Sequence, residues 1–163
     1  MTPNIYRDKV LNQLGEGDVG STLKVSGWVE NIRDHGGVSF IDLRDMYGML
    51  QVVLRDGNLL TGISKEDCIC VEGLIEHRDE ETYNPNIETG TIELEAHKIE
   101  VLGKVYRQLP FEIQTSKEIR EDLRLKHRYL DLRRPDLQRN LMLRSDIAAS
   151  IRSFLTKEGF LEI

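Results

Sequence analysis

Alternation of apolar and polar side chains constrains this chain more than any other feature. Five short runs show a period of two, and turn-forming residues separate them. A period of two is typical of a strand with one buried face and one exposed face. We expect strands at 21–34, 38–44, 49–55, 67–77 and 91–102. Leu59, Leu60 and Ile63 have helix-like spacing instead, so a short helix should cap the sheet between the third and fourth strands.

The connections between the first three runs predict a meander. His35-Gly36-Gly37 and Asp45-Met46-Tyr47-Gly48 should form tight turns, because glycine accepts a positive φ at little cost. Gly27, inside the first run, predicts a bulge or sharp coil of the kind that small barrels need. The order of three strands, a helix and two strands is that of an OB-fold, a five-stranded barrel often used for oligonucleotides. The fold class is therefore mostly β, with the barrel over residues 1–103.

The sequence changes character after the fifth run. Residues 104–126 are polar and lack sustained periodicity, which predicts a hinge or linker. From Asp136 the apolar residues recur mostly at steps of three and four, Pro135 suits the first helical position and Gly159 suits a C-terminal cap. This predicts one long helix of about 22 residues, followed by a strand that begins at Phe160. Because an amphipathic helix of this length needs a partner, we expect a piece of a larger protein.

Charge is divided unevenly along the chain. Residues 1–103 hold 9 Lys and Arg against 19 Asp and Glu, a net charge of −10, whereas residues 104–163 carry +4. An acidic barrel argues against charge-driven binding of nucleic acid, so any RNA binding should depend on stacking and base edges. No apolar run approaches the roughly 20 residues that span a bilayer, and the N-terminus lacks a secretory signal. We expect a cytoplasmic protein with no membrane partner.

Neither a disulfide nor a metal site is expected. Cys68 and Cys70 lie two residues apart on one predicted strand, a spacing that suits a disulfide poorly. No nearby cysteine and histidine have zinc-site spacing. Asp79, Glu80 and Glu81 could suggest a metal site, but adjacent carboxylates in a loop are more often simply solvated. Both thiols should be free and at least partly buried.

Two stretches resemble one known enzyme family. Residues 27–53, GWVENIRDHGGVSFIDLRDMYGMLQVV, are similar to the anticodon-binding barrel of bacterial-type aspartyl-tRNA synthetases. Residues 124–163, RLKHRYLDLRRPDLQRNLMLRSDIAASIRSFLTKEGFLEI, closely resemble the connector and first signature motif of the class II catalytic domain in the same enzymes. The resemblance implies an anticodon-binding domain over 1–103, a hinge over 104–126 and the start of a catalytic domain over 127–163.

The same resemblance implies the activity of the full-length protein. It would be a cytosolic homodimer that attaches aspartate to tRNA with ATP and magnesium, and the helix from Asp136 would form the dimer interface. The ATP- and aspartate-binding motifs would lie beyond Ile163. This chain alone should therefore have no catalytic residue, metal or cofactor of its own, and it should present the tRNA-reading end of the enzyme.

The resemblance assigns anticodon-binding roles to five residues: Arg33, Phe40, Gln51, Arg78 and Glu93. Phe40 should point outward and stack on the middle anticodon base, a contact worth roughly 1–3 kcal/mol. Gln51 should offer its amide to a base edge, and Arg33 should hold a phosphate or a base edge. Arg78 and Glu93 should help to read the first base. Without the resemblance, Phe40 would be a partly buried barrel aromatic, and the polar residues would be ordinary surface groups.

His35 and Glu81 bear on which tRNA is accepted. The resemblance associates a histidine in this turn, without a lysine at the position of Glu81, with relaxed enzymes that charge both tRNA(Asp) and tRNA(Asn). The expected partner is tRNA(Asp), with tRNA(Asn) as a second possible partner. Val53 stands where some relatives carry an aromatic residue, so a second stacking platform is not expected there.

Two other interpretations stay open. Asparaginyl- and lysyl-tRNA synthetases share the barrel and the motif order, although the RDHGGVSFIDLRD hairpin and the HRYLDLRRPDLQRN connector fit the aspartyl type better. The amino acid that the full-length enzyme activates would separate these classes. A stand-alone binding protein is the second interpretation, and the unfinished motif at Phe160-Leu161-Glu162-Ile163 argues against it.

Overall fold

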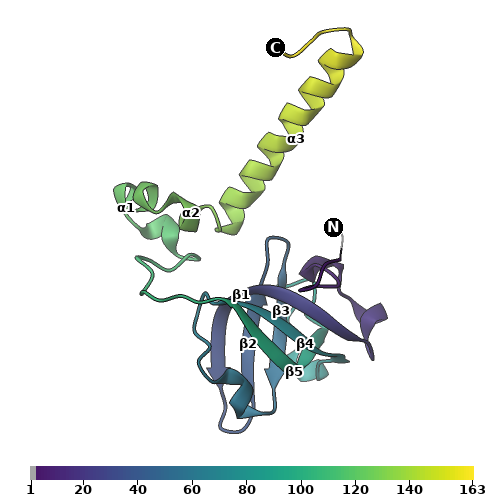
Figure 1. Ribbon diagram of the computed structural model, residues 1–163, viewed down its shortest axis with the longest axis vertical. Coiled ribbons are helices and arrows are strands. Elements are labelled where there is room, and N and C mark those ends of the chain that lie inside the picture. Colours follow the sequence, from purple (N-terminus) through teal and green to yellow (C-terminus); the bar gives the residue numbers. More distant parts are fainter. Residues whose placement is uncertain (1–2) are drawn as a thin grey trace. The chain divides into compact units, whose positions relative to one another are not determined.

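The computed structural model describes residues 3–163, which form two compact units: one ends at Arg107 and the other comprises Gln108–Ile163 (Figure 1). The first unit is a closed barrel with the strand order β1-β2-β3-β5-β4. Its strands are β1 (Thr22–Asp34), β2 (Ser39–Arg44), β3 (Met49–Leu54), β4 (Cys68–His77) and β5 (Ile92–Gly103). The five predicted strands and the OB-fold are confirmed, and each strand end lies within about one residue of its predicted position.

The barrel is antiparallel except where it closes. β3 and β5 pair in parallel through Val52 with Leu94 and Val53 with Glu95, and we call these two residue pairs the closing pairing. Inward side chains from all five strands fill the interior, as their alternation predicts. The fully buried ones include Val25, Val29, Ile41, Leu43, Leu50, Val52, Leu54, Ile69, Val71, Ile75, Ile92 and Leu94.

Short 3₁₀ segments complete the barrel core. In the lead-in, η1 (Leu11–Gln13) and η2 (Glu16–Asp18) precede β1, and Leu11 and Leu14 join the core. The predicted short helix between β3 and β4 is the 3₁₀ segment η3 (Gly57–Leu60), where Asp56 caps the N-terminus by accepting from the Asn58 N–H. Leu59 and Leu60 of this segment and Ile63, which follows it, pack against the core as their spacing predicts.

Two glycines let neighbouring backbones approach closely. A bulge or sharp coil is predicted at Gly27, and the register of β1 with β2 shifts two residues later, between Val29 and Asn31. A Cβ on Gly27 would lie 2.4 Å from the backbone oxygen of Arg44, and a Cβ on Gly73 would lie 2.1 Å from that of Glu95. Since no real Cβ comes so near to a backbone oxygen, only glycine fits these two positions.

Asp67, the residue just before β4, is a fully buried carboxylate with several donors. It accepts hydrogen bonds from the backbone N–H groups of Val105 at 2.7 Å and Ser64 at 2.8 Å, and from Lys104 Nζ at 3.0 Å. Burial opposes ionisation, but these donors outweigh it and hold the pKa of Asp67 below its ordinary value. The carboxylate thus ties the chain that leaves β5 to the loop before β4.

The second unit has a small core of its own. Phe111, Ile113 and Leu130 are buried together, with Leu109, Ile119 and Leu123 packed against them. Its helical elements are η5 (Ser116–Glu118), α1 (Glu121–Lys126), α2 (Arg128–Asp131) and α3 (Pro135–Lys157). Residues 108–126 lack a sustained period because elements of three to six residues are too short to show one. The role of 104–126 as a linker between two domains stays a prediction.

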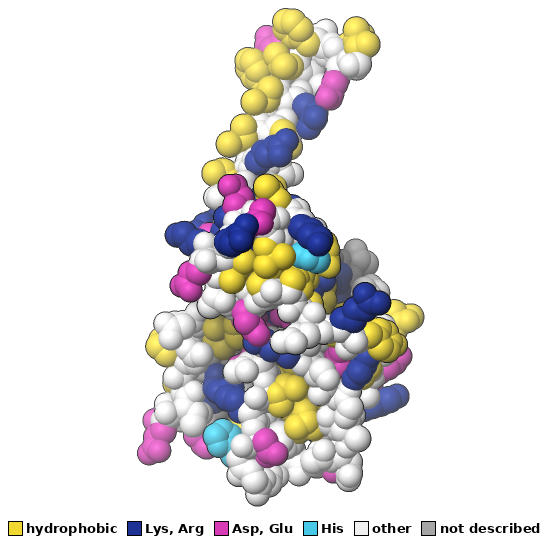
Figure 2. Space-filling view, turned by 90° about the vertical axis from the view of Figure 1, so that its left-hand side faces the viewer, with side chains coloured by type: hydrophobic (Ala, Val, Ile, Leu, Met, Phe, Trp, Pro, Cys, Tyr) yellow, Lys and Arg dark blue, Asp and Glu magenta, His cyan; other side chains and the backbone are white. Residues whose placement is uncertain are grey.

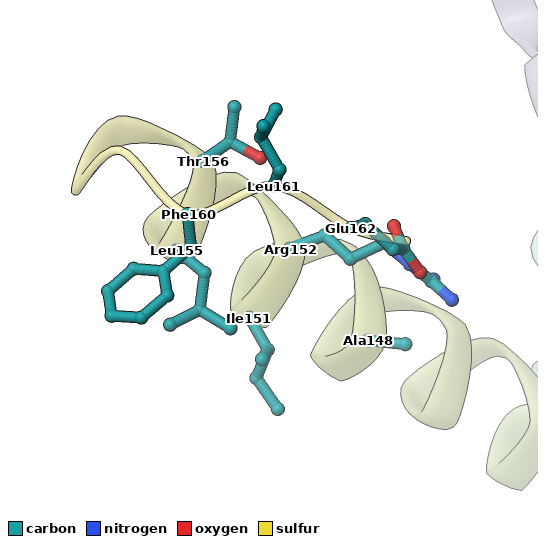
Figure 3. A pocket seen from close by; sticks show the side chains of 8 residues that line it. All are labelled: Ala148, Ile151, Arg152, Leu155, Thr156, Phe160, Leu161 and Glu162. Atoms are coloured by element: carbon teal, nitrogen blue, oxygen red, sulfur yellow. The ribbon is translucent and has the colours of Figure 1, made fainter.

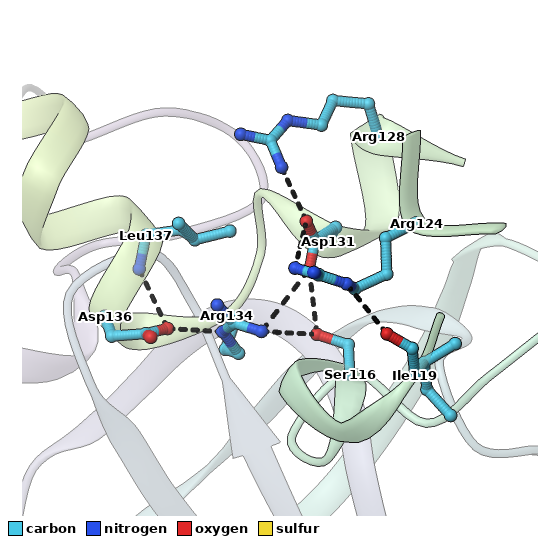
Figure 4. A network of polar contacts seen from close by, with 8 residues as sticks. All are labelled: Ser116, Ile119, Arg124, Arg128, Asp131, Arg134, Asp136 and Leu137. Carbon is cyan, nitrogen blue, oxygen red and sulfur yellow. Dashed lines mark hydrogen bonds and ion pairs between the residues drawn. The ribbon is translucent and has the colours of Figure 1, made fainter. Parts of the chain in front are cut away.

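A buried polar network joins the short elements of this unit to the start of α3 (Figure 4). Asp131 is fully buried and accepts from Arg128 Nη1 at 2.6 Å and from Ser116 Oγ at 2.9 Å. Arg134 Nη1 lies 3.6 Å from Asp131 Oδ1 and donates to Ser116 Oγ at 3.3 Å. A buried carboxylate is stable only when it is paired in this way, so the network fixes the chain just before Pro135.

The long helix is confirmed, with 23 residues and proline in its first turn. Gly159 has a φ of 87°, and the N–H groups of Gly159 and Phe160 donate to the carbonyls of Thr156 and Leu155. These two bonds form a Schellman cap. The strand predicted from Phe160 is not found in the described part of the chain, since a strand needs a hydrogen-bonded neighbour. Residues 160–163 instead turn back along α3, where Arg152 Nε donates to Glu162 Oε1 at 2.9 Å (Figure 3).

None of the α3 residues is buried, and apolar side chains gather along the helix (Figure 2). The large exposed ones are Leu141, Met142, Leu143, Ile147, Ile151, Phe154 and Leu155. Across residues 3–163, no helix combines the length and apolar character needed to cross a bilayer.

Candidate nucleic-acid interface

Outward side chains of β1, β2, β3 and β5, with the loop after β4, surround a groove of about 440 Å³. We call it the barrel groove. Six of the seven residues singled out in the sequence line it: Arg33, His35, Phe40, Gln51, Arg78 and Glu93. Glu81 is exposed in η4 (Glu80–Thr82) and is not among the lining residues. The fold therefore brings together residues that are up to 60 positions apart in the sequence.

Strand register places Phe40 at the middle of this groove. Phe40 on β2 pairs directly with Arg33 on β1 and with Val53 on β3. It is half-buried, so part of its ring stays open. The Arg33 guanidinium carbon lies 5.8 Å from the ring centroid, close to the outer limit of a cation–π contact. Phe40 is thus supported from both neighbouring strands and keeps a surface on which a flat ligand can stack.

The turn after β1 sets His35 against the edge of this ring. The N–H of His35 donates to the carbonyl of Val38 at 3.1 Å, and Gly36 and Gly37 have φ values of 72° and 157°. The predicted glycine turn is therefore confirmed. The His35 and Phe40 ring centroids are 5.7 Å apart, with an edge-on angle of 73°. The histidine borders the stacking surface without covering it face to face.

Gln51 faces the groove but is 6% exposed, because the neighbouring side chains cover it. Its Oε1 accepts from Arg78 Nη2 at 2.6 Å and from Arg33 Nη2 at 3.1 Å. Its Nε2 donates to Glu93 Oε2 at 2.8 Å. Both halves of the amide are therefore engaged by the protein, and a nucleotide that used this amide would have to replace one of these bonds.

Arg78 and Glu93 form the polar floor of the groove. The Arg78 side chain is 7% exposed, and its Nε lies 3.8 Å from Glu93 Oε2. That Nε is buried and has no hydrogen-bond partner among the described residues. Burial raises the pKa of Glu93, although the bond from Gln51 and the charge of Arg78 oppose the rise. The floor thus offers both donors and an acceptor to the edge of a base lying beside the Phe40 ring.

Sequence reasoning missed three polar residues of the lining: Arg55, Asp79 and Thr82. Arg55 could have been found, because it is the next outward position after Gln51 and Val53 on one alternating run. It donates to Glu95 Oε1 at 3.0 Å. Asp79 and Thr82 belong to an irregular loop, where no period indicates which side chains face the groove. Val53 lines the groove but supplies no ring.

No group of three or more His, Cys, Asp or Glu side chains within 3–163 is arranged to hold a metal ion. Cys68 is half-buried and Cys70 is buried, as predicted.

Comparisons with known families agree with the strand order and the groove. The family model described as "OB-fold nucleic acid binding domain" matches residues 23–102, and the one described as "tRNA synthetases class II (D, K and N)" matches residues 120–163. An aspartyl-tRNA synthetase structure from Entamoeba histolytica superposes with a TM-score of 0.82 at 20% identity, over 94% of this chain and 38% of that chain. At that identity, the structural likeness bears on the fold alone.

Curated relatives match at higher identity. The aspartate–tRNA(Asp/Asn) ligase of Roseobacter denitrificans is 44% identical over 98% of this chain, and the aspartate–tRNA ligase of Streptomyces griseus is 43% identical over 97% of it. The chain spans 27% of the length of each of these relatives. The two family matches lie in the same order as in the resemblance that the sequence suggested. We conclude that the chain belongs to the class II aspartyl-tRNA synthetase family.

Proposed function

We propose that this chain reads the anticodon of tRNA(Asp) as part of an aspartate–tRNA ligase. The observation that carries the proposal is the barrel groove, in which a half-open phenyl ring lies beside two guanidiniums, an amide and a carboxylate. Unpaired bases are bound by stacking on aromatic rings and by hydrogen bonds to their edges. Phe40 stacks the middle base, Arg33 and Gln51 contact its edge, and Arg78 and Glu93 read the first base.

The charge of the barrel favours recognition over general affinity. Residues 1–103 carry a net charge of −10, so the surface as a whole repels a polyphosphate. The groove lining departs from this acidic balance, because it holds Arg33, Arg55 and Arg78 against Asp79 and Glu93. Binding of an RNA loop should therefore depend strongly on its bases, because the net charge of the barrel opposes binding through the phosphates alone.

A filter-binding titration with anticodon stem-loops tests this function. We expect loops with the anticodons GUC or GUU to bind more tightly than loops of unrelated sequence and equal length. Equal affinity for all loops would contradict base reading. Binding to duplex and loop alike would indicate a general nucleic-acid surface instead.

The chemistry of the full-length enzyme is the second part of the proposal. The relatives are named as ligases of aspartate and tRNA, and we infer that the full-length protein joins the two with ATP and magnesium in the cytoplasm. Those reactants would bind in the part of the enzyme that this chain does not include, so the chain alone should not aminoacylate tRNA. Amino-acid-dependent ATP–pyrophosphate exchange by the full-length enzyme tests this, and activation of asparagine or lysine in place of aspartate would contradict it.

The proposed enzyme is a homodimer through α3. Support comes from the exposed apolar residues of that helix, including Ile151 and Phe154, and from a groove of about 380 Å³ between the end of α3 and residues 160–162. Burying such a face against a second copy would remove it from water. Sedimentation of the full-length enzyme should show a dimer, and Ile151→Asp should shift it toward monomer. An unchanged dimer in this variant would place the interface elsewhere.

Acceptance of tRNA(Asn) is the finest part of the proposal. His35 borders the Phe40 ring and lines the groove, and position 81 carries a glutamate and not a lysine. We infer that the enzyme discriminates loosely at the third anticodon base and charges both tRNAs. Charging purified tRNA(Asn) with aspartate by the full-length enzyme tests this, and the absence of any product would contradict it.

A further inference from the structure

We propose that Asp42 is a positioning residue that holds Arg33 so that its remaining donors face the base stacked on Phe40. Through this contact Asp42 makes the groove select for a base with an acceptor at that edge. The inference rests on the proposed anticodon reading, and it adds a residue that the sequence did not suggest.

Asp42 lies on the same outward face of β2 as Phe40, in alternation with the buried Ile41 and Leu43. It is two residues from Phe40 on the same strand, and its cross-strand partner on β3 is Gln51. Arg33, whose own cross-strand partner is Phe40, reaches diagonally to Asp42 and donates from Nη2 to Oδ1 at 2.6 Å. The same Nη2 also donates to Gln51 Oε1 at 3.1 Å. One nitrogen of the guanidinium is therefore held by two acceptors on two strands.

The two bonds leave the rest of the guanidinium available. Arginine has five N–H donors in a fixed planar fork, and the two on Nη2 are used by Asp42 and Gln51. Nη1 and Nε of Arg33 have no acceptor in the described part of the chain. Because the fork is rigid, anchoring one nitrogen fixes where the other donors point. Beside the Phe40 ring, those donors meet the edge of a stacked base.

Anchoring matters because Arg33 is otherwise a mobile side chain. Its side chain is 44% exposed, whereas that of Asp42 is 22% exposed. A long exposed arginine gives up considerable rotamer freedom when it is held in one position. With Asp42 in place, that freedom is already lost before RNA arrives, so a base contact is made at lower entropic cost.

The chemistry of the free donors defines the base that fits. Uracil presents carbonyl oxygens at its edge, whereas cytosine replaces one of them by an amino group. A guanidinium held in one position donates to the carbonyl oxygen of uracil, but it cannot donate to the amino group of cytosine, which is itself a donor. The groove should therefore prefer uracil to cytosine at the stacked position, and the preference should depend on how firmly Arg33 is held.

A comparison of two stem-loops measures this preference. The probes are anticodon loops that differ only at the middle base, GUC and GCC, titrated against the wild-type chain and Asp42→Ala. One well-placed base contact discriminates by about tenfold or more. We expect the wild-type ratio of dissociation constants to be of that order, and the ratio to fall below about threefold in Asp42→Ala. Asp42→Asn, which keeps a neutral acceptor of the same shape, should give an intermediate ratio.

Asp79→Asn is the matched control for charge. Asp79 lines the same groove and has no bond to Arg33. Its substitution removes one negative charge, as Asp42→Asn does, and should change the affinity for both loops equally while leaving their ratio intact. A double variant of Asp42→Ala with Arg33→Ala should have the ratio of Arg33→Ala alone, because both changes remove the same contact.

The outcomes separate this inference from the proposed function. If the wild-type chain prefers the GUC loop and Asp42→Ala keeps the same ratio of dissociation constants, the role of Asp42 is overturned. Its bond to Arg33 is then an ordinary surface ion pair. An equal loss of ratio in Asp79→Asn overturns it as well, because the effect is then general charge. A wild-type chain that prefers neither loop contradicts the reading function itself. Melting temperatures close to wild type in each variant show that the fold is retained.

Discussion

Gln51 on β3 donates a hydrogen bond of 2.8 Å to Glu93 on β5, so an amide and a carboxylate that are 42 residues apart bridge the two strands at the floor of the barrel groove. Two guanidiniums hold the other half of the same amide. These groove residues are therefore already bonded to one another in the protein alone. The groove is pre-organised, and binding should exchange these bonds rather than create order.

Glu93→Gln should make the chain more stable near neutral pH. Burial raises the pKa of Glu93 above its ordinary 4.5, so the folded state binds a proton more readily than the unfolded state does. The charged carboxylate then costs stability at neutral pH, and this cost disappears as the pH falls below the ordinary value. Urea midpoints at pH 7, 6 and 5 should show an advantage for Glu93→Gln that shrinks on acidification. An advantage that grows on acidification would contradict the direction of the shift.

Phe40→Ala should weaken binding of a GUC stem-loop by about 1–3 kcal/mol, the usual contribution of one base–aromatic stack. Phe40→Leu should lose nearly as much, since it keeps apolar volume but has no ring, and Phe40→Tyr should stay close to wild type. Filter binding gives the affinities. Similar affinities for the leucine and tyrosine variants would show that Phe40 acts through packing rather than stacking.

Asp67→Asn should destabilise the barrel by roughly 1–3 kcal/mol at pH 7, because a buried network of donors loses its charged acceptor. The donors on Val105, Ser64 and Lys104 lower the pKa of Asp67 in the folded state, although burial opposes them. The stabilisation is therefore present above the ordinary value of 3.8 and is lost as the pH falls through the folded-state pKa. Urea unfolding at several pH values should show the two proteins converging in acid, whereas the half-buried surface control Glu72→Gln should show no comparable difference at pH 7.

Gly73→Ala should cost more than about 2 kcal/mol, since its Cβ would meet the backbone oxygen of Glu95 and force the strands apart. Gly57→Ala is the matched control, because a Cβ there would meet no atom within 4 Å and its φ is not positive. Thermal unfolding of both variants measures the difference. Equal melting temperatures would show that β4 and β5 separate without cost at this point.

Much of the fold follows from the sequence because each barrel strand has one buried face. In β2, for example, the fully buried Ile41 and Leu43 alternate with the half-buried Phe40 and Asp42, and a slip of one residue would move the Asp42 carboxylate into the core. The same period marked Phe40 and Gln51 as groove residues. Position and face were therefore predictable at the level of single residues.

The bonds between those residues were not predictable, because they depend on which strands become neighbours. Glu93 reaches Gln51 only through the parallel pairing of β3 with β5, which alternation does not encode. The position of the bulge in β1 is a second case. Gly27 indicated a bulge at its own position, but it serves the close approach of Arg44, and the register shifts between Val29 and Asn31. The sequence shows that a glycine lacks a Cβ, but it does not show which neighbouring backbone occupies the position that the Cβ would take.

The closing pairing has one further consequence. β2 and β3 share six residue pairs, but β3 and β5 share only two, which come directly after Gln51 and Glu93 along their strands. Local opening begins where the fewest backbone hydrogen bonds hold two strands together, so the barrel should open first between β3 and β5. An RNA loop bound to both Gln51 and Glu93 would bridge these two strands and oppose their separation, so recognition of the RNA would also protect the barrel against local unfolding.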